Sequence, residues 1–569
     1  MRYKQFKITK NEYEHIKSNL NREPNDFELH LFSATYCEHC AYKHSKGLLG
    51  LLPREVAGKK AIFCDENAGG VEIGDHAILF KMESHNHPCA VEPFNGAATG
   101  IGGIVRDVLA MNARPIALCN SLKFGSQSDK RSKFLLSGVV EGISTYGNSI
   151  GVPTVSTEVL IDDCYIQNPL VNVTAIGIAK KSDILTSNKA EVGLKLMLVG
   201  SHTMRDGMGG AAFASKKLSD ESAEDKISIQ MANPFMKKKL IEACLNIFSK
   251  KLVVSCQDCG AAGILSSTSE VAFKSDCGVN IDLAKIHLGD NSIQDFEIML
   301  SETQERMLFV VKDENIAEIE QILKDYELAF STIGEVIEDK KFIVKKDNQI
   351  LADIPTELLV TPPKVGLNFD CKYNAVGQVC PTYSVDGNNP NIYEQYDHTV
   401  GARTQFHPFL PSVLEINSDK NQVLIEPSNL PQTSPNFNSL WIYEENCFLG
   451  IYTFSAIITE KPFETVYNSL SAAAKLLKSK GFEPIGITNC LNFANPEIPP
   501  TMYEFRETIM AIKQACEEIQ IPVCSGNVSF YNEYTGGKIK NTPTFTMLGI
   551  KKHKSFRPHI DIIDPASGC

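Results

Sequence analysis

The 569-residue sequence lacks three features, and each absence excludes a class of protein. No apolar run reaches about 18 residues, so the sequence predicts no membrane-spanning helix. The first residues, MRYKQFKITKNEYEHI, lack the apolar core of a secretory signal, so we expect no leader and a cytoplasmic location. Basic residues are not in excess, because the formal net charge is −12, which argues against a general nucleic-acid-binding protein. A small phosphorylated ligand needs only a few local donors or a metal ion and remains compatible with this charge.

The remaining composition is that of a globular protein. Hydrophobic residues make up 43% and charged residues 22% of the chain. The 17 cysteines are scattered and odd in number, which without a secretory signal is typical of reduced thiols. The chain is too long for one hydrophobic core, so we expect about three or four domains.

A unit of about 150 residues occurs twice. Pro115 aligns with Pro484 and Asn120 with Asn489, which gives an offset of 369 residues. The aligned segments are ARPIALCNSLKFG (113–125) with FEPIGITNCLNFA (482–494), IGVPTVS (150–156) with IQIPVCS (519–525) and, after a three-residue slip, TAIGI (174–178) with TMLGI (546–550). An offset that holds over this distance indicates a duplicated domain.

Within each copy, apolar strands alternate with amphipathic helices, which predicts an α/β class with α+β layers. A separate α/β domain lies between the copies, and a segment rich in Pro, Gly and Asn follows it. We therefore predict an N-terminal helical arm (1–30), a first A domain (31–180), a B domain (181–365), a connector (366–389), a second A domain (390–555) and a C-terminal stub (556–569).

The two copies differ where the first is most polar. The segment LFKMESHNHPCAVEPF (79–94), taken as a strand, puts its odd-numbered polar residues on one face: Lys81, Glu83, His85 and His87. The second copy has packing residues at this offset: Gly450, Tyr452, Phe454 and Ala456. A lysine can hold a phosphate, a glutamate can hold Mg²⁺ and a histidine can move a proton. The alternative, a solvated polar strand face, is less consistent with four such residues in register.

Two glycine-rich segments allow opposite interpretations. GAATGIGG (96–103) and DGMGGA (206–211) could bind phosphate through exposed backbone N–H groups. Each could equally be a tight turn or a site of close packing. Neither segment matches the P-loop or dinucleotide-binding pattern.

The segment TYCEHCAYKH (35–44) contains a Cys-x-x-Cys pair, Cys37 and Cys40, with His39 between them. Such a pair can be half of a zinc site, a redox dithiol, a nucleophilic centre or incidental. A second pair, Cys256 and Cys259, begins 219 residues later, whereas a zinc ribbon places its pairs roughly 15–20 residues apart. The spacing argues against zinc, and redox chemistry stays a minor alternative.

Six motifs, in order, resemble one family. They are ATYCEHCAYKHS, FKMESHNHPCAVEPFNGAATGIGGIVRDVLAMNARPIAL, QDCGAAG, LSETQERM, TNCLNFANPE and CSGNVSFYNE. Together they closely resemble phosphoribosylformylglycinamidine synthase, in its stand-alone synthetase subunit of the small bacterial type. The resemblance runs from about Thr9 to about residue 550. It implies a fold like that of aminoimidazole ribonucleotide synthetase, in which paired A domains form a barrel-like core flanked by B domains.

The resemblance also implies a reaction. ATP phosphorylates the amide oxygen of formylglycinamide ribonucleotide, ammonia displaces the phosphate, and the amidine forms with release of ADP and phosphate. This is a ligase step of purine biosynthesis that uses Mg²⁺. No glutaminase domain is recognisable in the sequence, so the implied partners are a glutamine amidotransferase subunit and a small bridging subunit.

The resemblance assigns roles residue by residue. The implied catalytic residues are His39 and His85. The implied ATP contacts are Tyr42, Lys81, Asn489 and Gly526. The implied substrate contacts are Ser84, His85, Asn86, His87, Arg106, Gln230, Glu302, Thr303, Gln304 and Ser529. The implied magnesium ligands are Glu83, Asp107, Asp258 and Asn527, all of which offer the hard oxygen atoms that Mg²⁺ prefers.

The sequence departs from the family pattern at four places. Cys37 and Thr303 stand where the family has Ser, and Asn489 stands where many relatives have Asp. The family also continues past the second A domain into a second B-like domain, for which this chain has no counterpart. An auxiliary structural nucleotide site in that half should therefore be incomplete. Two alternatives stay open: a non-catalytic nucleotide-binding assembly subunit, and another ATP-using synthetase of the same superfamily.

Overall fold

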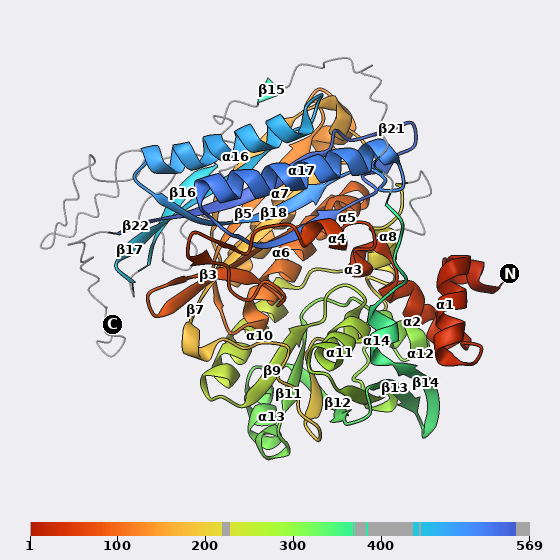
Figure 1. Ribbon diagram of the computed structural model, residues 1–569. Coiled ribbons are helices and arrows are strands. Elements are labelled where there is room, and N and C mark those ends of the chain that lie inside the picture. The colour runs from red at the N-terminus through yellow and green to blue at the C-terminus, as the bar shows by residue number, and fades with distance from the viewer. Residues whose placement is uncertain are drawn as a thin grey trace, which may run out of the picture.

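Two sheets from the repeated units lie face to face, and the sheet of the B unit lies beyond them (Figure 1). The computed structural model describes residues 2–218, 228–367, 369, 383–384, 436–442 and 445–552. Most of the predicted connector, the first part of the predicted second A domain and the predicted C-terminal stub lie outside these residues. Among the helices described, none combines the length and the apolar character needed to cross a membrane.

The first repeat forms a sheet of strand order β15-β6-β5-β7-β4-β3, in which β5 and β6 are parallel. Helices α6 and α7 cover its outer face. Helix α7 begins after Asp129, whose carboxylate accepts a hydrogen bond from Ser132 N, and ends at Gly151, whose φ of 73° is left-handed. The elements are β3 (Gly69–Ile73), β4 (His76–Ser84), α5 (Asn86–Val91), α6 (Pro93–Ala110), β5 (Arg114–Phe124), α7 (Lys130–Ile150), β6 (Thr154–Ile161), β7 (Leu170–Lys180) and β15 (Tyr383–Ser384).

The second repeat forms a sheet of order β16-β17-β22-β18-β19. Read from β19, this order matches β6-β5-β7-β4-β3 of the first sheet, whose edge strand β15 has no counterpart among the described residues. Helices α16 and α17 cover its outer face, above the sheets in Figure 1. The elements are β16 (Phe437–Ile442), β17 (Cys447–Ser455), α16 (Pro462–Ser479), β18 (Glu483–Asn492), α17 (Pro499–Ile519), β19 (Val523–Ser529), β20 (Glu533–Tyr534), β21 (Gly537–Lys538) and β22 (Thr542–Lys552).

The predicted α/β class and duplication are confirmed, down to the strand register. Leu118 pairs with Thr154 in the first sheet, and Ile487 pairs with Val523 in the second, so both positions carry the offset of 369. A register shift follows immediately after Leu118 and after Ile487. An irregularity that recurs at the same offset is a property of the ancestral unit and not of one copy.

The predicted barrel-like core is not a closed barrel. Strand β4 packs on β18 and β19 while β17 packs on β5 and β6, so the two sheets contact through their faces. In the part of the chain that the structure describes, no strand of one sheet pairs with a strand of the other. Apolar side chains such as Phe80, Ile116, Leu449 and Ile451 fill the space between the sheets. Burial of these faces joins the repeats as two open layers, without any hydrogen bonding between their edges.

The B unit has a mixed sheet of order β14-β13-β10-β12-β8-β11-β9 with helices on both faces. Helix α10 contacts α6 and α7, and this contact fixes the B unit against the first repeat. The elements are β8 (Lys195–Gly200), α8 (Gly210–Phe213), α10 (Pro234–Ser249), β9 (Val253–Asp258), α11 (Gly263–Lys274), β10 (Gly278–Asp282), α12 (Asp295–Leu300), β11 (Arg306–Val311), α13 (Ile316–Asp325), β12 (Ala329–Ile337), β13 (Lys341–Lys346), β14 (Gln349–Pro355) and α14 (Thr356–Val360).

The N-terminal segment packs on the B unit and carries the Cys-x-x-Cys motif to the junction of the domains. Thr9 and Asn25 each form a capping box, which fixes where α1 and α2 begin. The buried Tyr36 hydroxyl donates a 2.6 Å hydrogen bond to Leu358 O. The elements are α1 (Lys10–Leu20), α2 (Asp26–Thr35), α3 (Glu38–Ala41), α4 (Lys46–Leu49), β1 (Glu55–Val56) and β2 (Lys59–Lys60).

The segment GAATGIGG is part of helix α6 and not a loop, and three of its glycines, Gly96, Gly100 and Gly102, serve close packing. A Cβ atom added at Gly96 would lie 2.6 Å from both Cys89 N and Pro88 C, which are backbone atoms of α5. The hydrogen bond from Cys89 N to His85 O lies in the same turn. Gly96 therefore lets α5 and α6 approach each other at the end of β4.

Gly96→Ala is expected to lower the free energy of unfolding by roughly 1–3 kcal/mol, because the methyl group overlaps backbone that cannot move away alone. Urea denaturation followed by circular dichroism measures this loss. Gly103→Ala on the same helix is the control, because the atom nearest to its added Cβ lies 3.9 Å away, and alanine favours a helix. Equal stability of both variants would contradict the packing role of Gly96.

Candidate functional site

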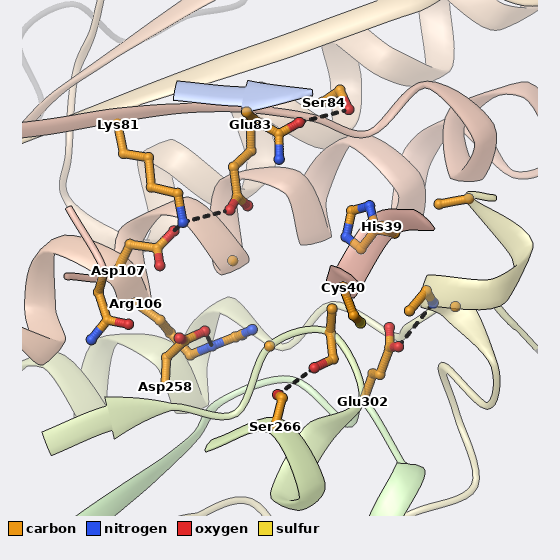
Figure 2. A pocket seen from close by; sticks show the side chains of 18 of the residues that line it. His39, Cys40, Lys81, Glu83, Ser84, Arg106, Asp107, Asp258, Ser266 and Glu302 are labelled. Atoms are coloured by element: carbon orange, nitrogen blue, oxygen red, sulfur yellow. Dashed lines mark hydrogen bonds and ion pairs between the residues drawn. The ribbon is translucent and has the colours of Figure 1, made fainter. Parts of the chain in front are cut away.

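A cavity of about 440 Å³ opens where the first repeat, the B unit and the second repeat meet. This volume is within the range typical of ligand sites, about 300–1,000 Å³. The predicted residues that line it are His39, Tyr42, Lys81, Glu83, Ser84, His85, Arg106, Asp107, Gln230, Asp258, Glu302, Gln304, Gly526 and Asn527. Residues from far-apart segments of the chain therefore converge on one site (Figure 2).

Lys81 holds two carboxylates together at one side of the cavity. Its Nζ lies 2.9 Å from a Glu83 oxygen on the same strand and 3.1 Å from an Asp107 oxygen on α6 (Figure 2). Burial alone would raise the pKa of Glu83, but Lys81 outweighs burial and lowers this pKa to about 2. Burial raises the pKa of Asp107 well above its ordinary value despite Lys81. Two carboxylates therefore share one ammonium group in a desolvated place, where burial favours neutralising Asp107 by a proton or by a bound cation.

Arg106 connects the first repeat to the B unit from the adjacent position on α6. The residue is 1% exposed, and its Nε lies 3.4 Å from Asp258 Oδ2 at the end of β9. Its Nη1 donates to Gln304 Oε1, and its Nη2 donates a 3.4 Å bond to Cys259 O. A buried guanidinium with a planar set of donors is suited to an anionic or carbonyl-bearing ligand.

Glu302 lines the cavity on the side of the B unit, across from the cluster of Lys81, Glu83 and Asp107 (Figure 2). One carboxylate oxygen accepts 3.0 Å hydrogen bonds from Ala211 N and Ala262 N, and the other accepts a 3.0 Å bond from Gln230 Nε2. Burial raises the pKa of Glu302 to about 7, although these donors act in the opposite direction. Of the backbone N–H groups of DGMGGA, that of Ala211 is thus engaged by a protein carboxylate. Gly207 and Gly209 of this segment have φ of 72° and 71°, as in a tight turn.

The two histidines proposed as catalytic are held differently. His39 lies on α3, and its backbone N–H donates a 3.0 Å bond to Ser215 Oγ. His85 Nδ1 lies 2.6 Å from Gly96 O and must donate there, because a carbonyl oxygen only accepts. Burial lowers the pKa of both imidazoles, so both are neutral near pH 7. Neutral His85 therefore keeps an unprotonated Nε2 that can accept a proton.

The prediction that Lys81 to His87 share one strand face is wrong beyond Glu83. Strand β4 ends at Ser84, and α5 follows directly, with His85 at its N-cap. His87 is consequently on a helix, where its Nε2 donates a 3.0 Å bond to Lys216 O. It lines a small neighbouring cavity together with Asn86 and Ser529.

The second repeat contributes two asparagine side chains, Asn527 on β19 and Asn489 on β18. Asn527 Oδ1 accepts a 3.4 Å bond from Ser84 Oγ, and its Nδ2 donates a 3.3 Å bond to Tyr42 Oη. Asn489 lies beside it in a cavity of about 60 Å³ that Tyr42, Leu49 and Leu52 also line. Asn489 is 1% exposed, and its Nδ2 atom has no hydrogen-bond partner. A buried amide donor without a partner beside a partly apolar cavity is the kind of group that a bound base or sugar satisfies.

Two predicted substrate contacts already have protein partners. The Asn86 amide nitrogen donates to Asn492 Oδ1 at 2.9 Å, and its oxygen accepts a 2.8 Å bond from Val171 N, so this side chain fastens the two repeats together. The Thr303 hydroxyl donates a 2.8 Å bond to Asp206 Oδ1. Thr303 therefore holds the loop before α8 through this hydrogen bond, and its predicted contact with a ligand stays a prediction.

Cysteines do not form a metal centre in the described part of the chain. The described cysteines are free thiols, and among the described residues no group of three or more His, Cys, Asp or Glu side chains could by itself hold a metal ion. Cys256 is buried on β9, and the Cys259 sulfur lies 3.6 Å from Ser267 Oγ. The second Cys-x-x-Cys pair thus belongs to the core of the B unit.

Several residues that line the cavity were missed by the sequence analysis. Glu270 and Lys274 on α11 line it, and Gln257 Nε2 donates a 2.8 Å bond to Glu270 Oε2. The spacing of Glu270 and Lys274 by four residues was visible, but this pattern is common on any solvated helix. Asp65 and Glu66 come from a segment with no distinguishing pattern.

Lys237 on α10 is a buried amine behind Arg106. It is fully buried and its Nζ has no hydrogen-bond partner. Burial, followed by repulsion from Arg106, lowers the pKa of Lys237 to about 7, while Glu305 and Asp258 act in the opposite direction. Burial of this amine therefore costs stability, and the cost is greatest at a pH below about 7, where the amine is protonated.

Lys237→Met is expected to raise the free energy of unfolding on the order of 2–4 kcal/mol at pH 7. The unfolded chain binds the extra proton between about pH 7 and 10.5, so the stability of the unsubstituted chain rises with pH in this window and the gain from Met shrinks. Denaturation curves at pH 6, 8 and 10 measure the trend. Lys238→Met is the control, because Lys238 is an exposed neighbour paired with Glu242. A gain that is constant with pH would contradict this account.

Family models match most of the chain. The AIR synthase related protein N-terminal domain matches residues 65–179 and 451–551, and the corresponding C-terminal domain matches residues 191–347. The formylglycinamide ribonucleotide amidotransferase linker domain matches residues 1–43. The N-terminal-domain model thus matches both repeats.

Curated relatives and solved structures agree with these models. Phosphoribosylformylglycinamidine synthase subunit PurL of Caldanaerobacter subterraneus subsp. tengcongensis is 40% identical over 96% of this chain and 74% of its own length. The protein of the same name from Petrotoga mobilis is 42% identical over 95% of this chain and 73% of its own. T. maritima PurL complexed with FGAR superimposes with a TM-score of 0.78 at 35% identity, covering 95% of this chain and 83% of that one.

Two further T. maritima structures cover 95% of this chain and 82% of their own. PurL complexed with ATP superimposes with a TM-score of 0.76 at 33% identity. PurLQS superimposes with a TM-score of 0.79 at 33% identity.

Proposed function

Because the chain belongs to the family of phosphoribosylformylglycinamidine synthase subunit PurL, we propose that it converts formylglycinamide ribonucleotide and ammonia to formylglycinamidine ribonucleotide, with ATP cleaved to ADP and phosphate. The observation that carries this proposal is the convergence of Lys81, Arg106 and Glu302 on one cavity between three domains. Relatives are described as complexes with FGAR and with ATP, which supports both substrates. The step belongs to purine biosynthesis, and we place the protein in the cytoplasm.

The reaction needs two transfers. The γ-phosphoryl group of ATP moves to the amide oxygen of the substrate, so the carbon gains a phosphate leaving group. Ammonia then attacks this carbon, the C–O bond breaks, and phosphate leaves with the oxygen atom. An enzyme accelerates such a sequence mainly by positioning both substrates and by neutralising the charge that develops on the phosphoryl group.

The chain's own cations are placed for these transfers. Lys81 contacts the ATP phosphates, and Asn489, Tyr42 and Gly526 hold the nucleoside end, where the Asn489 amide donor lacks a protein partner. Arg106 holds the amide-bearing ribonucleotide. The further substrate contacts are Ser84, Asn86, His87, Gln230, Glu302, Thr303, Gln304 and Ser529. This division puts the nucleotide against the two repeats, whereas the ribonucleotide contacts come from the B unit and from both repeats.

His85 is the proton acceptor in this proposal. Gly96 O fixes the Nδ1 proton, so Nε2 stays available to take a proton from the attacking nitrogen. His39 lies across the same cavity and stabilises the reacting amide. Both imidazoles must be neutral to accept a proton, and burial keeps them so.

The residues proposed for Mg²⁺ fit its chemistry. Glu83, Asp107, Asp258 and the amide oxygen of Asn527 are hard oxygen donors around the cavity. Mg²⁺ usually binds through one or two carboxylates together with substrate phosphates, so a preformed protein cage is not required. When bound, Mg²⁺ would neutralise the phosphate charge. Burial disfavours Asp107 as an uncompensated anion beside the Lys81–Glu83 pair, and this favours a cation there.

Ammonia comes from glutamine in this proposal, through a separate amidotransferase subunit and a small bridging subunit. The described relative PurLQS from T. maritima supports an assembly of this kind. Neither nucleic acid nor a membrane is required as a partner.

ADP release by the purified chain tests the proposal. ATP, Mg²⁺, the ribonucleotide and a high concentration of ammonium chloride are supplied without partner subunits. Release is expected only when both the ribonucleotide and ammonium are present. A well-folded chain that binds ATP without any such release would overturn the proposal in favour of a nucleotide-binding assembly subunit. Release without the ribonucleotide would indicate a different ATP-using synthetase or kinase.

A further inference from the structure

Cys37 and Cys40 lie on one short helical turn at the edge of the cavity, which Cys40 lines. Cys37 is the N-cap of α3 and Cys40 follows three residues later, a spacing that puts two side chains on the same side of a turn. The turn is closed by a 2.9 Å bond from Ala41 N to Cys37 O. Both thiols are free, and both residues are only partly buried. Two thiols placed in this way within one Cys-x-x-Cys turn need little backbone movement to form a disulfide.

The same turn carries His39, and Cys40 lines the cavity with it (Figure 2). The His39 backbone N–H donates a 3.0 Å hydrogen bond to Ser215 Oγ, so the position of His39 depends on the conformation of this turn. A disulfide holds its sulfur atoms about 2.0 Å apart, closer than two unbonded thiols can lie. Its formation therefore pulls together the two ends of the turn that carries His39, and we expect it to reorient His39.

We propose that Cys37 and Cys40 are a reversible oxidation site, at which a peroxide forms a disulfide that inactivates the enzyme. The Cys37 thiolate attacks one peroxide oxygen, the O–O bond breaks, and a sulfenic acid forms as the first water leaves. Cys40 sulfur then attacks the sulfenic sulfur, and the second oxygen leaves as water. The two thiols lose two electrons and two protons, and hydrogen peroxide becomes two waters.

The electrostatics of the pair set the order of attack. The hydrogen bond from Cys40, which outweighs burial, lowers the pKa of Cys37, whereas the pKa of Cys40 is raised well above its ordinary value. Cys37 is therefore the nucleophile and Cys40 the resolving thiol. Burial raises the pKa of most other described cysteines, such as Cys164, where it reaches about 12. Oxidation should accordingly select the Cys37–Cys40 pair among the described cysteines.

Peptide mass measures the oxidation directly and independently of turnover. The tryptic peptide Glu23–Lys43 contains Cys37 and Cys40 and no other cysteine. After treatment of the full chain with hydrogen peroxide, this peptide is expected to lose two hydrogen atoms. Dithiothreitol should restore them. A peptide that stays in the dithiol form while other thiols oxidise would overturn the proposal.

Turnover measures the consequence, which rests on the proposed function. Peroxide is expected to lower the rate of ribonucleotide-dependent ADP release on the order of 100-fold, as expected when a group that stabilises the reacting amide is displaced. Dithiothreitol should reverse this loss, and Cys37→Ser, which keeps a hydrogen-bonding hydroxyl, should prevent it. Cys64→Ser is the matched control, because Cys64 also lines the cavity and its removal should leave the sensitivity unchanged. Equal sensitivity of Cys37→Ser would overturn the proposal.

These readouts separate the two proposals. A reduced chain without turnover whose peptide still forms the disulfide contradicts the proposed function and supports the oxidation site. An active chain whose peptide does not oxidise supports the function and overturns the oxidation site. The mass measurement uses the unsubstituted chain, so a variant that fails to fold does not affect it.

Discussion

Glu83→Gln is expected to lower turnover by at least about 10²–10³-fold while leaving the fold intact. The substitution keeps the shape of the side chain and removes the negative charge that faces Lys81 at 2.9 Å. The cluster then keeps only Asp107 as a carboxylate to share Lys81, so it no longer favours a cation beside the nucleotide phosphates. Lys81 keeps Asp107 at 3.1 Å, which limits the structural effect. ADP release at saturating substrates measures the loss, and thermal denaturation checks the fold.

Glu72→Gln is the matched control for this experiment. Glu72 lies on the adjacent strand β3, is exposed, and pairs with Lys181 at 3.1 Å away from the cavity. The same change of charge there should leave turnover within about a factor of two, since exposed ion pairs contribute little. Turnover of Glu83→Gln equal to that of the control would contradict the role of Glu83.

The duplication could be predicted because it is written in the sequence as a repeated offset. The helices show how closely the copies correspond: α6 spans Pro93–Ala110 and α16 spans Pro462–Ser479, so both ends differ by 369 residues. The three-residue slip predicted before residue 546 also exists, because Ile178 pairs with Arg114 and Ile550 pairs with Glu483. Such a pattern defines which strands correspond, so corresponding strands occupy the same relative places in the two sheets, but it does not give the strand order itself.

The relation between the two sheets could not be predicted in the same way. An offset does not tell whether sheets join at their edges or pack through their faces. Phe80 and Leu449 are apolar in either arrangement, and both lie between the sheets. The closed barrel came from the resemblance alone, and the pairing of the described strands shows two open sheets instead.

Local geometry explains the other errors. Alternation from Lys81 to His87 predicted one strand face, but β4 ends at Ser84, where its pairing with β7 ends opposite Asn172. The glycines of GAATGIGG are helical because α5 and α7 need close approach to α6. Asn86 shows a further limit, because the partners of its amide nitrogen are residues more than 400 positions away. No pattern near Asn86 could indicate that its hydrogen bonds are already used within the protein.

His85→Ala is expected to lower turnover by about 10²–10⁴-fold, the contribution usual for a positioned proton acceptor. The hydrogen bond from Nδ1 to Gly96 O leaves Nε2 as the accepting atom. Ala removes both nitrogens, and Gly96 O still accepts a 3.4 Å bond from Thr99 Oγ1. Assays of ADP release, stopped at fixed times at pH 7 with high ammonium, measure the effect. His76→Ala is the control, because His76 pairs with Glu445 at 2.7 Å at the start of β4, the end of the strand away from His85.

The pH dependence separates His85 from His39 as the acceptor. Burial lowers the pKa of His85 below 6.5, so protonation switches the acceptor off only as pH falls below that value. The unsubstituted enzyme should therefore lose kcat/KM on the acidic side, and this acid limb should be absent from the residual activity of His85→Ala. An acid limb that persists in His85→Ala but disappears in His39→Ala would instead assign proton acceptance to His39. Because the two imidazoles lie on different elements, β4–α5 and α3, the second result would shift the site of ammonia attack toward the Cys-x-x-Cys turn.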